Sequence, residues 1–144
     1  DVLIQDCTAG ALLHGMQIKG TKDRGGYVRN VTVADCKLMK VTVFSSLNYN
    51  NDGEAAPELP SFENITFRNL DLSEASVKEP VININGFKGM SHRVKNLTFQ
   101  DIILPESASV SVSDAESIKF INVLSVSGTK PKYAVTESKD VSYK

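Results

Sequence analysis

The stretch Asn30-Val31-Thr32-Val33-Ala34-Asp35 decides the fold of this chain, because its pattern returns along the sequence. It reappears as Asn64-Ile65-Thr66-Phe67-Arg68-Asn69 and as Asn96-Leu97-Thr98-Phe99-Gln100-Asp101. The polar residue that closes the pattern also occurs at Asp6 and Asn122, so successive members of this polar column lie 29, 34, 32 and 21 residues apart. A repeat of about 20 to 35 residues with a constant strand and a variable remainder is typical of a solenoid.

Two apolar columns accompany the polar one. The residues two positions earlier are Ile4, Val33, Phe67, Phe99 and Phe120, and those four positions earlier are Val2, Val31, Ile65, Leu97 and Ile118. Their alternation with polar residues is typical of half-buried strands. A second strand is predicted in each repeat, at 15–19, 41–45, 80–85, 110–113 and 133–137, and no segment has helical periodicity.

Equivalent strands of successive repeats run in the same direction and stack side by side. The sequence therefore predicts an all-β, parallel β-helix of about five coils. Its shortest repeat, 21 residues, is close to one bare turn. The longer repeats carry loops, for example at 21–26, 47–61 and 86–93, and such insertions often carry binding in repeat proteins.

Composition excludes several classes of protein. The 144 residues suffice for one domain, and the formal net charge of −1, from 16 basic and 17 acidic residues, lacks the basic excess of a nucleic-acid binder. No run of about 18 apolar residues exists, so no membrane span is predicted. The chain begins inside a strand, and we expect residues 1–144 to be the C-terminal part of a single β-helix domain, truncated at its N-terminal end and completed by an upstream part of the same β-helix.

The polar column has a structural interpretation. Asp and Asn bond to neighbouring backbone at bends and tolerate unusual torsions, so five of them at one corner would form a polar ladder. Metal ligands converge on a point, whereas these side chains are spread along an axis, and no metal or organic cofactor is predicted. Three sequons, which begin at Asn30, Asn64 and Asn96, share one repeat position, so the repeat itself explains them.

Two cysteines, Cys7 and Cys36, occupy one column of adjacent repeats. Parallel neighbours in a sheet lie about 4.8 Å apart, which is within disulfide range. A pair of buried thiols that behave as small hydrophobic side chains is the favoured interpretation, and a disulfide stays open as the alternative.

One segment resembles a known family. The residues Gly15-Met16-Gln17-Ile18-Lys19-Gly20, followed by Arg24-Gly25-Gly26-Tyr27-Val28-Arg29-Asn30-Val31, are similar to a late segment of the polygalacturonases, the pectin hydrolases of glycoside hydrolase family 28. The strand that ends near Tyr49 and the later Phe62-Glu63-Asn64-Ile65-Thr66-Phe67 fit the same pattern. The resemblance implies a right-handed, pectin-lyase-like β-helix from a protein that is secreted, periplasmic or on the cell surface.

The resemblance also implies an activity and a set of binding residues. The resemblance implies an inverting hydrolase of α-linked galacturonan, in which one carboxylic acid protonates the leaving oxygen and one carboxylate activates water as a base. The family's carboxylate motifs, Asn-Thr-Asp and Asp-Asp, and its Gly-His-Gly motif are absent here, so the catalytic residues are expected upstream of Asp1 and none is assigned in this chain. Lys19 corresponds to the family lysine that binds a sugar carboxylate, and Tyr49 to its substrate-binding tyrosine. Arg24 is a further candidate for substrate contact.

Gln17 departs from the family pattern, which has arginine at this position. Glutamine cannot make the bidentate charged pair that arginine makes with a carboxylate, so a neutral sugar and a rhamnogalacturonan-type substrate are favoured here. Pectic polysaccharide is the expected partner. Two alternatives remain open from the sequence: a non-catalytic carbohydrate-binding or adhesin β-helix, and a β-helix of the pectate-lyase or epimerase kind.

Overall fold

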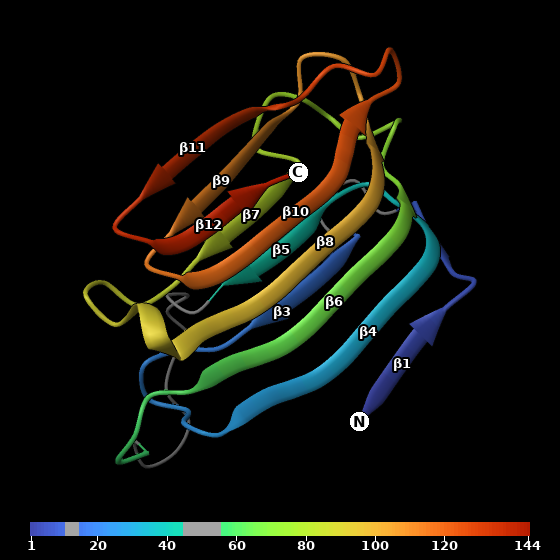
Figure 1. Ribbon diagram of the computed structural model, residues 1–144. Helices are drawn as coiled ribbons and strands as arrows, with labels where there is room; N and C mark the ends of the chain where they lie inside the picture. The colour runs from blue at the N-terminus through green and yellow to red at the C-terminus, as the bar shows by residue number, and fades with distance from the viewer. Residues whose placement is uncertain (11–14, 45–55) are drawn as a thin grey trace.

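The chain folds almost entirely into parallel β-strands (Figure 1). The structure is a computed structural model that describes residues 1–10, 15–44 and 56–144. Its strands are β1 (Val2–Gln5), β2 (Thr8–Ala9), β3 (Met16–Lys19), β4 (Tyr27–Leu38), β5 (Val41–Phe44), β6 (Ser61–Asp71), β7 (Ile82–Asn85), β8 (Val94–Leu104), β9 (Ser109–Ser113), β10 (Glu116–Ser125), β11 (Lys132–Thr136) and β12 (Lys139–Tyr143). Within the described residues the single helical element is the 3₁₀ turn η1 (Ser91–Arg93), and no helix there could cross a membrane. The all-β prediction and the prediction of parallel sheets are confirmed.

The described strands form two sheets that face each other across the core. The long sheet has the order β1-β4-β6-β8-β10-β12, with β2 also paired to β4, and the short sheet has the order β11-β9-β7-β5-β3. The chain passes alternately from one sheet to the other, and each strand pairs in parallel with the equivalent strand of the next repeat. The predicted second strands coincide with the short sheet, apart from position 45, which lies outside the described residues.

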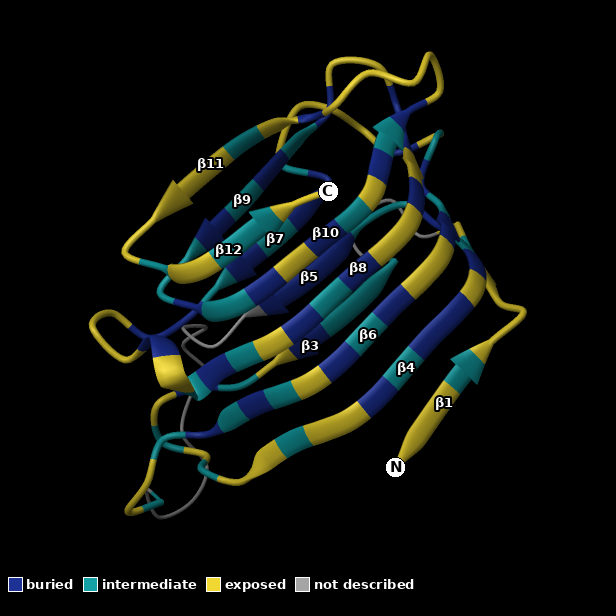
Figure 2. Ribbon diagram, in the orientation of Figure 1, coloured by how far each residue is buried: buried dark blue, intermediate teal, exposed yellow. Residues whose placement is uncertain are grey.

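Both predicted apolar columns are confirmed by the register of the long sheet. Val2, Val31, Ile65, Leu97 and Ile118 pair successively across β1, β4, β6, β8 and β10. Ile4, Val33, Phe67, Phe99 and Phe120 do the same two positions later. From β4 to β10 these side chains are at most 5% exposed, and Figure 2 shows buried residues alternating with others along β4, β6, β8 and β10.

An aromatic stack lies at the centre of this core. The ring centroids of Phe67 and Phe99 are 4.8 Å apart with an interplanar angle of 10°, and those of Phe99 and Phe120 are 5.1 Å apart at 18°. Phe120 in turn packs against Tyr133 and Tyr143.

The repeat thus continues into β11 and β12, one coil beyond the last polar residue that the sequence pattern identified. Burial and the nearby Tyr143 raise the pKa of Tyr133 to about 12.

The polar column marks a bend in the long sheet from the coil of β1 and β2 to β10. Its members all have left-handed backbone, with φ between 51° and 56°: Asp6, Asp35, Asn69, Asp101 and Asn122. Asn69 Nδ2 donates to Asp35 Oδ1 at 2.6 Å, and Asn122 Nδ2 donates to Asp101 Oδ1 at 2.8 Å. Asp and Asn are the residues other than glycine that tolerate this conformation best. The structural interpretation of the column is therefore confirmed.

A second polar column bends the same strands five residues earlier. Asn30, Asn64 and Asn96 have φ between 55° and 57° and are exposed. The Nδ2 of Asn64 donates to Asn30 Oδ1, and that of Asn96 donates to Asn64 Oδ1, each at 3.2 Å. The three sequons therefore arise from a corner of the repeat that favours asparagine, although Ser117 occupies the same corner in β10 with a φ of 57°.

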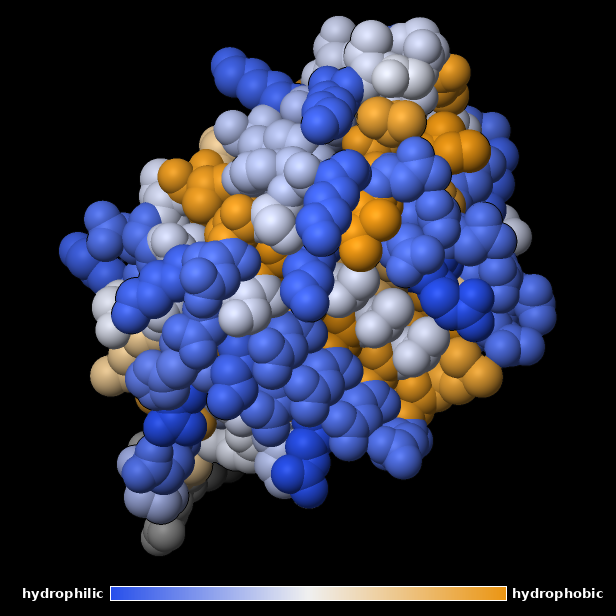
Figure 3. Space-filling view, in the orientation of Figure 1, coloured by the Kyte–Doolittle hydropathy of each residue, from blue (hydrophilic) through white to orange (hydrophobic). Residues whose placement is uncertain are grey.

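Charges alternate in sign across the outer face of the long sheet. The residues Arg29, Glu63, Lys95, Glu116 and Lys139 pair in register across β4, β6, β8, β10 and β12. Lys95 Nζ lies 3.5 Å from Glu63 Oε2. Figure 3 shows hydrophilic side chains gathered over this part of the face, near the starts of the strands. Opposite charges on neighbouring strands favour this register. A shift of one strand by one residue relative to its neighbour would remove the contacts between opposite charges.

The prediction of two buried thiols is wrong for Cys7. Cys36 is 4% exposed and belongs to the core, whereas Cys7 is exposed, and both are free. The cause is the position of β1 and β2, which form the outermost strand of the long sheet, so Cys7 has a neighbouring coil on one side within the described structure.

Replacing Phe99 with alanine should destabilise the fold by about 3–5 kcal/mol, because Phe99 is fully buried between Phe67 and Phe120. Urea unfolding of the variant and the wild type measures the difference. Lys119→Ala on the exposed side of β10 is the control, and its effect should stay within about 0.5 kcal/mol. A similar small loss for both variants would contradict the central role of the stack.

The column at Asp101 predicts a specific acid sensitivity. Side-chain hydrogen bonds from Asn122 and then Gln100 hold the pKa of Asp101 below its ordinary value. Its contribution to stability is therefore present above the unfolded pKa of about 4 and is lost as the pH falls through the lower folded pKa.

Asp101→Asn keeps an oxygen acceptor for Asn122 but cannot titrate, so the variant should lose less stability than the wild type between pH 5 and pH 2. Urea midpoints across this range measure the effect. Glu137→Gln, at an exposed carboxylate outside the column, is the control. Parallel acid curves for Asp101→Asn and the wild type would show that the ladder does not depend on the charge of Asp101.

Candidate functional site

Strand β3 places Gln17 and Lys19 on the same side of the short sheet. Ile18 is buried in the core and Met16 packs against it, so the intervening side chains project from the outer face. Lys19 is exposed and Gln17 is half-buried. Because successive side chains of β3 point to opposite faces, two of the four predicted site residues, Gln17 and Lys19, lie on the same side of the sheet.

The outer face of the short sheet continues from these residues as two rows. In register with Gln17 lie Thr42, Asn83, Ser111 and Ala134. The row that begins at Lys19 passes Phe44 and continues with Asn85, Ser113 and Thr136. Beyond β5, the members of both rows are small side chains, most of which bear an amide or a hydroxyl. We refer to these two rows as the outer polar rows.

The electrostatics of this face are simple. Lys19 carries the one charge in the outer polar rows, and the sequences of β3, β5, β7, β9 and β11 contain neither Asp nor Glu. Ser113 Oγ donates to Asn85 Oδ1 at 3.0 Å, which joins the coils of β7 and β9. The two rows therefore offer one cation followed mainly by neutral hydrogen-bonding groups, and Lys132 on β11, in register with Ser109, adds a second exposed cation to the same face. This face cannot supply the pair of carboxylates that an inverting glycosidase requires.

Thr42 stands out within these rows. It is 1% exposed although it belongs to the outer face, and its Oγ1 has no hydrogen-bond partner in the part of the chain that the structure describes. An unpaired buried hydroxyl costs about 1–3 kcal/mol. Its place in the row between Gln17 and Asn83 puts this unsatisfied group within the candidate site.

The other predicted residues lie elsewhere. Arg24 is exposed in the turn that joins β3 to β4, and its backbone N–H donates to Thr21 O at 3.2 Å. Gly25 and Gly26 have φ of +60° and +75°, which confirms that they serve a tight turn. Tyr49 lies outside the described residues.

Sequence analysis missed the downstream part of the face. Asn83, Ser111 and the residues in register with them were within the predicted strands, but their side of the sheet was not assigned. The signal was present, because the alternating sequences Ile82-Asn83-Ile84-Asn85 and Ser109-Val110-Ser111-Val112-Ser113 put polar residues at every second position.

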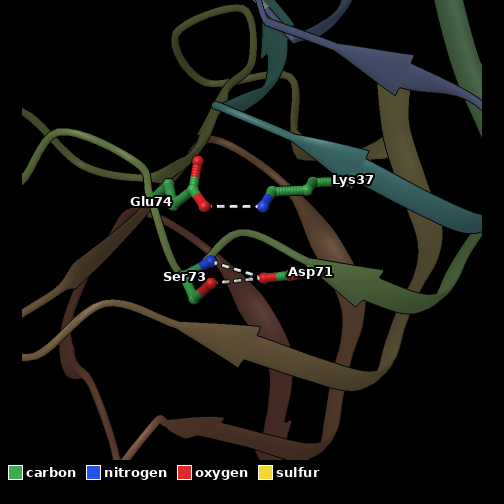
Figure 4. A network of polar contacts seen from close by, with 4 residues as sticks. All are labelled: Lys37, Asp71, Ser73 and Glu74. Carbon is green, nitrogen blue, oxygen red and sulfur yellow. Dashed lines mark hydrogen bonds and ion pairs between the residues drawn. The ribbon is translucent and has the colours of Figure 1, made fainter.

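A second polar cluster follows strand β6 (Figure 4). Asp71 accepts hydrogen bonds from Ser73 N at 2.9 Å and Ser73 Oγ at 2.6 Å, which lower its pKa. Lys37 Nζ lies 2.6 Å from Glu74 Oε1, and this hydrogen bond and charge raise its pKa. Each charged group has a partner within the cluster, so the arrangement fixes the loop after β6 and leaves no activated acid, base or nucleophile.

Across residues 1–10, 15–44 and 56–144, no group of three or more His, Cys, Asp or Glu side chains is arranged to hold a metal ion. The outer polar rows hold mainly neutral hydrogen-bonding groups together with the ammonium of Lys19.

Comparison with protein-family models, with curated proteins and with solved structures found no match to this chain in any of the three.

Thr42→Val should raise the free energy of unfolding by about 1 kcal/mol, because valine keeps the shape and removes the unpaired hydroxyl. Thr42→Ala is the matched control. It also removes the hydroxyl but leaves a cavity, so it should not stabilise the protein. Thermal and urea unfolding of the three proteins give the order. A clear loss of stability in Thr42→Val would show that the hydroxyl has a hydrogen-bond partner in solution.

Proposed function

We propose that this chain is part of a pectin hydrolase of the polygalacturonase type and that it binds pectic polysaccharide along the outer polar rows. The observation that carries the proposal is the common projection of Gln17 and Lys19 from β3. Both belong to the motif that resembles the family, and both stand at the start of a face of amides and hydroxyls. A sugar polymer needs such neutral donors and acceptors, and a uronate also needs a cation.

A right-handed parallel β-helix is the proposed architecture. The alternation of the chain between two sheets, with parallel in-register pairing in both, supports it. The hand follows from the general rule that connections between parallel strands of one sheet are right-handed in about 98% of cases. The coils would then stack along one axis, and the outer polar rows would run parallel to that axis.

The spacing of the rows suits a polysaccharide that runs along the axis. Neighbouring strands are about 4.8 Å apart, so each row presents a new hydrogen-bonding group at about this interval. The ammonium of Lys19 would bind the carboxylate of one galacturonic acid residue. Gln17 and the neutral groups beyond it favour uncharged sugars, and for this reason we propose a rhamnogalacturonan-type polymer in preference to pure galacturonan.

The catalytic carboxylates are proposed to come from a further coil of the same β-helix. The open edges of β1 and β3 support this placement, since they could pair with additional strands. Between them lies an apolar hollow of about 360 Å³ lined by core residues that include Ile4, Met16, Ile18 and Val28. A coil stacked on this end would bury that surface and would place carboxylates beside Lys19. A secreted or cell-surface location is proposed, because the substrate is a polymer.

Lys19→Met should weaken the binding of rhamnogalacturonan fragments about tenfold or more, because a hydrogen bond between charged groups contributes about 1.5–3 kcal/mol. Calorimetry with the present chain measures this affinity. Lys119→Met, an exposed strand lysine on the long sheet, is the control and should leave the affinity unchanged. The wild-type affinity should fall with added salt, and that of Lys19→Met should fall less.

Three outcomes separate the rival functions. Equal affinity of Lys19→Met and the wild type would overturn the proposed site. Binding that depends on Lys19, without new reducing ends from a protein extended before Asp1, would support the non-catalytic carbohydrate-binding module. New ends that carry an unsaturated sugar would indicate a lyase instead of a hydrolase.

A further inference from the structure

Cys7 and Cys36 form a pair that the proposed binding function does not use. The register brackets them, because Gln5 pairs with Ala34 on one side and Thr8 pairs with Lys37 on the other. The Lys37 N–H donates to Cys7 O at 2.9 Å, which fixes the two cysteines directly opposite each other. Their Cα atoms are therefore separated by one strand spacing of about 4.8 Å, inside the range of 4.4–6.8 Å that disulfides require.

Both thiols point in the same direction. Cys7 Sγ donates to Gln5 O at 3.1 Å, and Cys36 Sγ donates to Ala34 O at 3.0 Å. Because the two acceptor residues are themselves paired, the sulfurs are also about one strand spacing apart. Burial raises the pKa of the Cys36 thiol, and the Cys7 thiol contributes through its side-chain hydrogen bond and charge. Neither sulfur needs to change its side of the strand for the two to meet.

The pair is also accessible. Cys7 and Cys36 line a surface hollow of about 490 Å³, together with Asp6, Asp35 and Lys37. With the edge of β1 open, as it is in residues 1–144, Cys7 is exposed and Cys36 is buried, so a reagent reaches Cys7 first. Asp71 and Asp101 also line it, and these four aspartates outnumber the one lysine, so the hollow is acidic and favours a neutral oxidant over an anionic one.

We propose that Cys7 and Cys36 form a reversible disulfide that fastens β1 and β2 to β4. A small-molecule disulfide is the oxidant. The Cys7 thiolate attacks one of its sulfurs, forms a mixed disulfide and releases one small thiol. The Cys36 thiolate then attacks Cys7 Sγ and releases the second small thiol. The protein loses two electrons and two protons, and the oxidant gains them as its two thiols.

The strand spacing makes this bond easy to reduce. Disulfides prefer Cβ atoms about 3.5–4.5 Å apart, so the edge strand must move toward β4 by up to about 1 Å. Strained and exposed disulfides have the higher reduction potentials and are the labile ones. The bond would close a loop between Cys7 and Cys36 that contains β3, and would hold the edge coil that carries Gln17 and Lys19.

The test uses the present chain and hydroxyethyl disulfide, a neutral oxidant, without denaturant. Wild-type protein should lose two hydrogens, retain no thiol that iodoacetamide can alkylate and remain monomeric. Millimolar dithiothreitol should reverse the change without unfolding. In Cys36→Ala the reaction should stop at the mixed disulfide on Cys7, and in Cys7→Ser, which alters an exposed side chain, Cys36 should remain unmodified.

The structural consequence has its own measurement. Hydrogen exchange of the β1 amides should slow at least tenfold in the oxidised protein, and Tm should rise by roughly 5–10 °C. A stable mixed disulfide on wild-type Cys7 with Cys36 still reduced, or a disulfide-linked dimer, would overturn the proposal. An internal disulfide that leaves the exchange of β1 unchanged would overturn its role as a fastening of the edge coil.

Discussion

The fold depends on a backbone constraint that recurs in every coil: the long-sheet strands must turn sharply without losing their pairing. A residue in the left-handed region makes such a turn within one position, but it costs most L-residues about 1–2 kcal/mol. Of the thirteen non-glycine residues with positive φ in the described structure, ten are Asp or Asn. Their short polar side chains tolerate the conformation and bond to the next coil, as Asn69 does to Asp35. The corners are thus stabilised by residues that a simple hydrophobic pattern would treat as surface.

Once the corners are in register, the remaining columns follow. Phe67, Phe99 and Phe120 can stack at 4.8–5.1 Å because their strands are held at the same spacing. The alternating charges on the outer face reinforce the register from the solvent side, since a shift of the pairing by one residue would remove the contacts between opposite charges. The aromatic stack of the core, the Asp and Asn residues of the bends and the charged pairs of the surface therefore favour the same alignment of the strands. Such agreement between different kinds of interaction is what specifies a fold.

The sequence could predict the residues of the repeated columns and could not predict the environment of the first and last described coils. Columns such as Ile65, Leu97 and Ile118 were assigned residue by residue, because a period of two within a longer repeat leaves little freedom. The exposure of Cys7 was missed, since its column is identical to that of Cys36 and only its place on the outermost strand distinguishes it. The coil of β11 and β12 was partly missed because the polar column ends at Asn122 and the following bends use Glu137 and Asp140. A repeat pattern predicts the environment of a residue that has a coil on both sides, whereas β1 and β12 lie at the edges of the described long sheet.

The residues of the proposed site are subject to different constraints from those of the core that supports it. Inner residues such as Val41 and Val43 fix the strand, so the outer positions are not required to pack and can be chosen for chemistry. Gln17 and Lys19 could therefore be identified only through a motif, and Thr42 only through its burial without a partner. Packing alone would allow valine at Thr42, because its hydroxyl is buried and has no hydrogen-bond partner among the described residues. At 1% exposure that hydroxyl is out of reach of a ligand on the surface, so binding would fall to the accessible members of the rows, Gln17 and Lys19 among them.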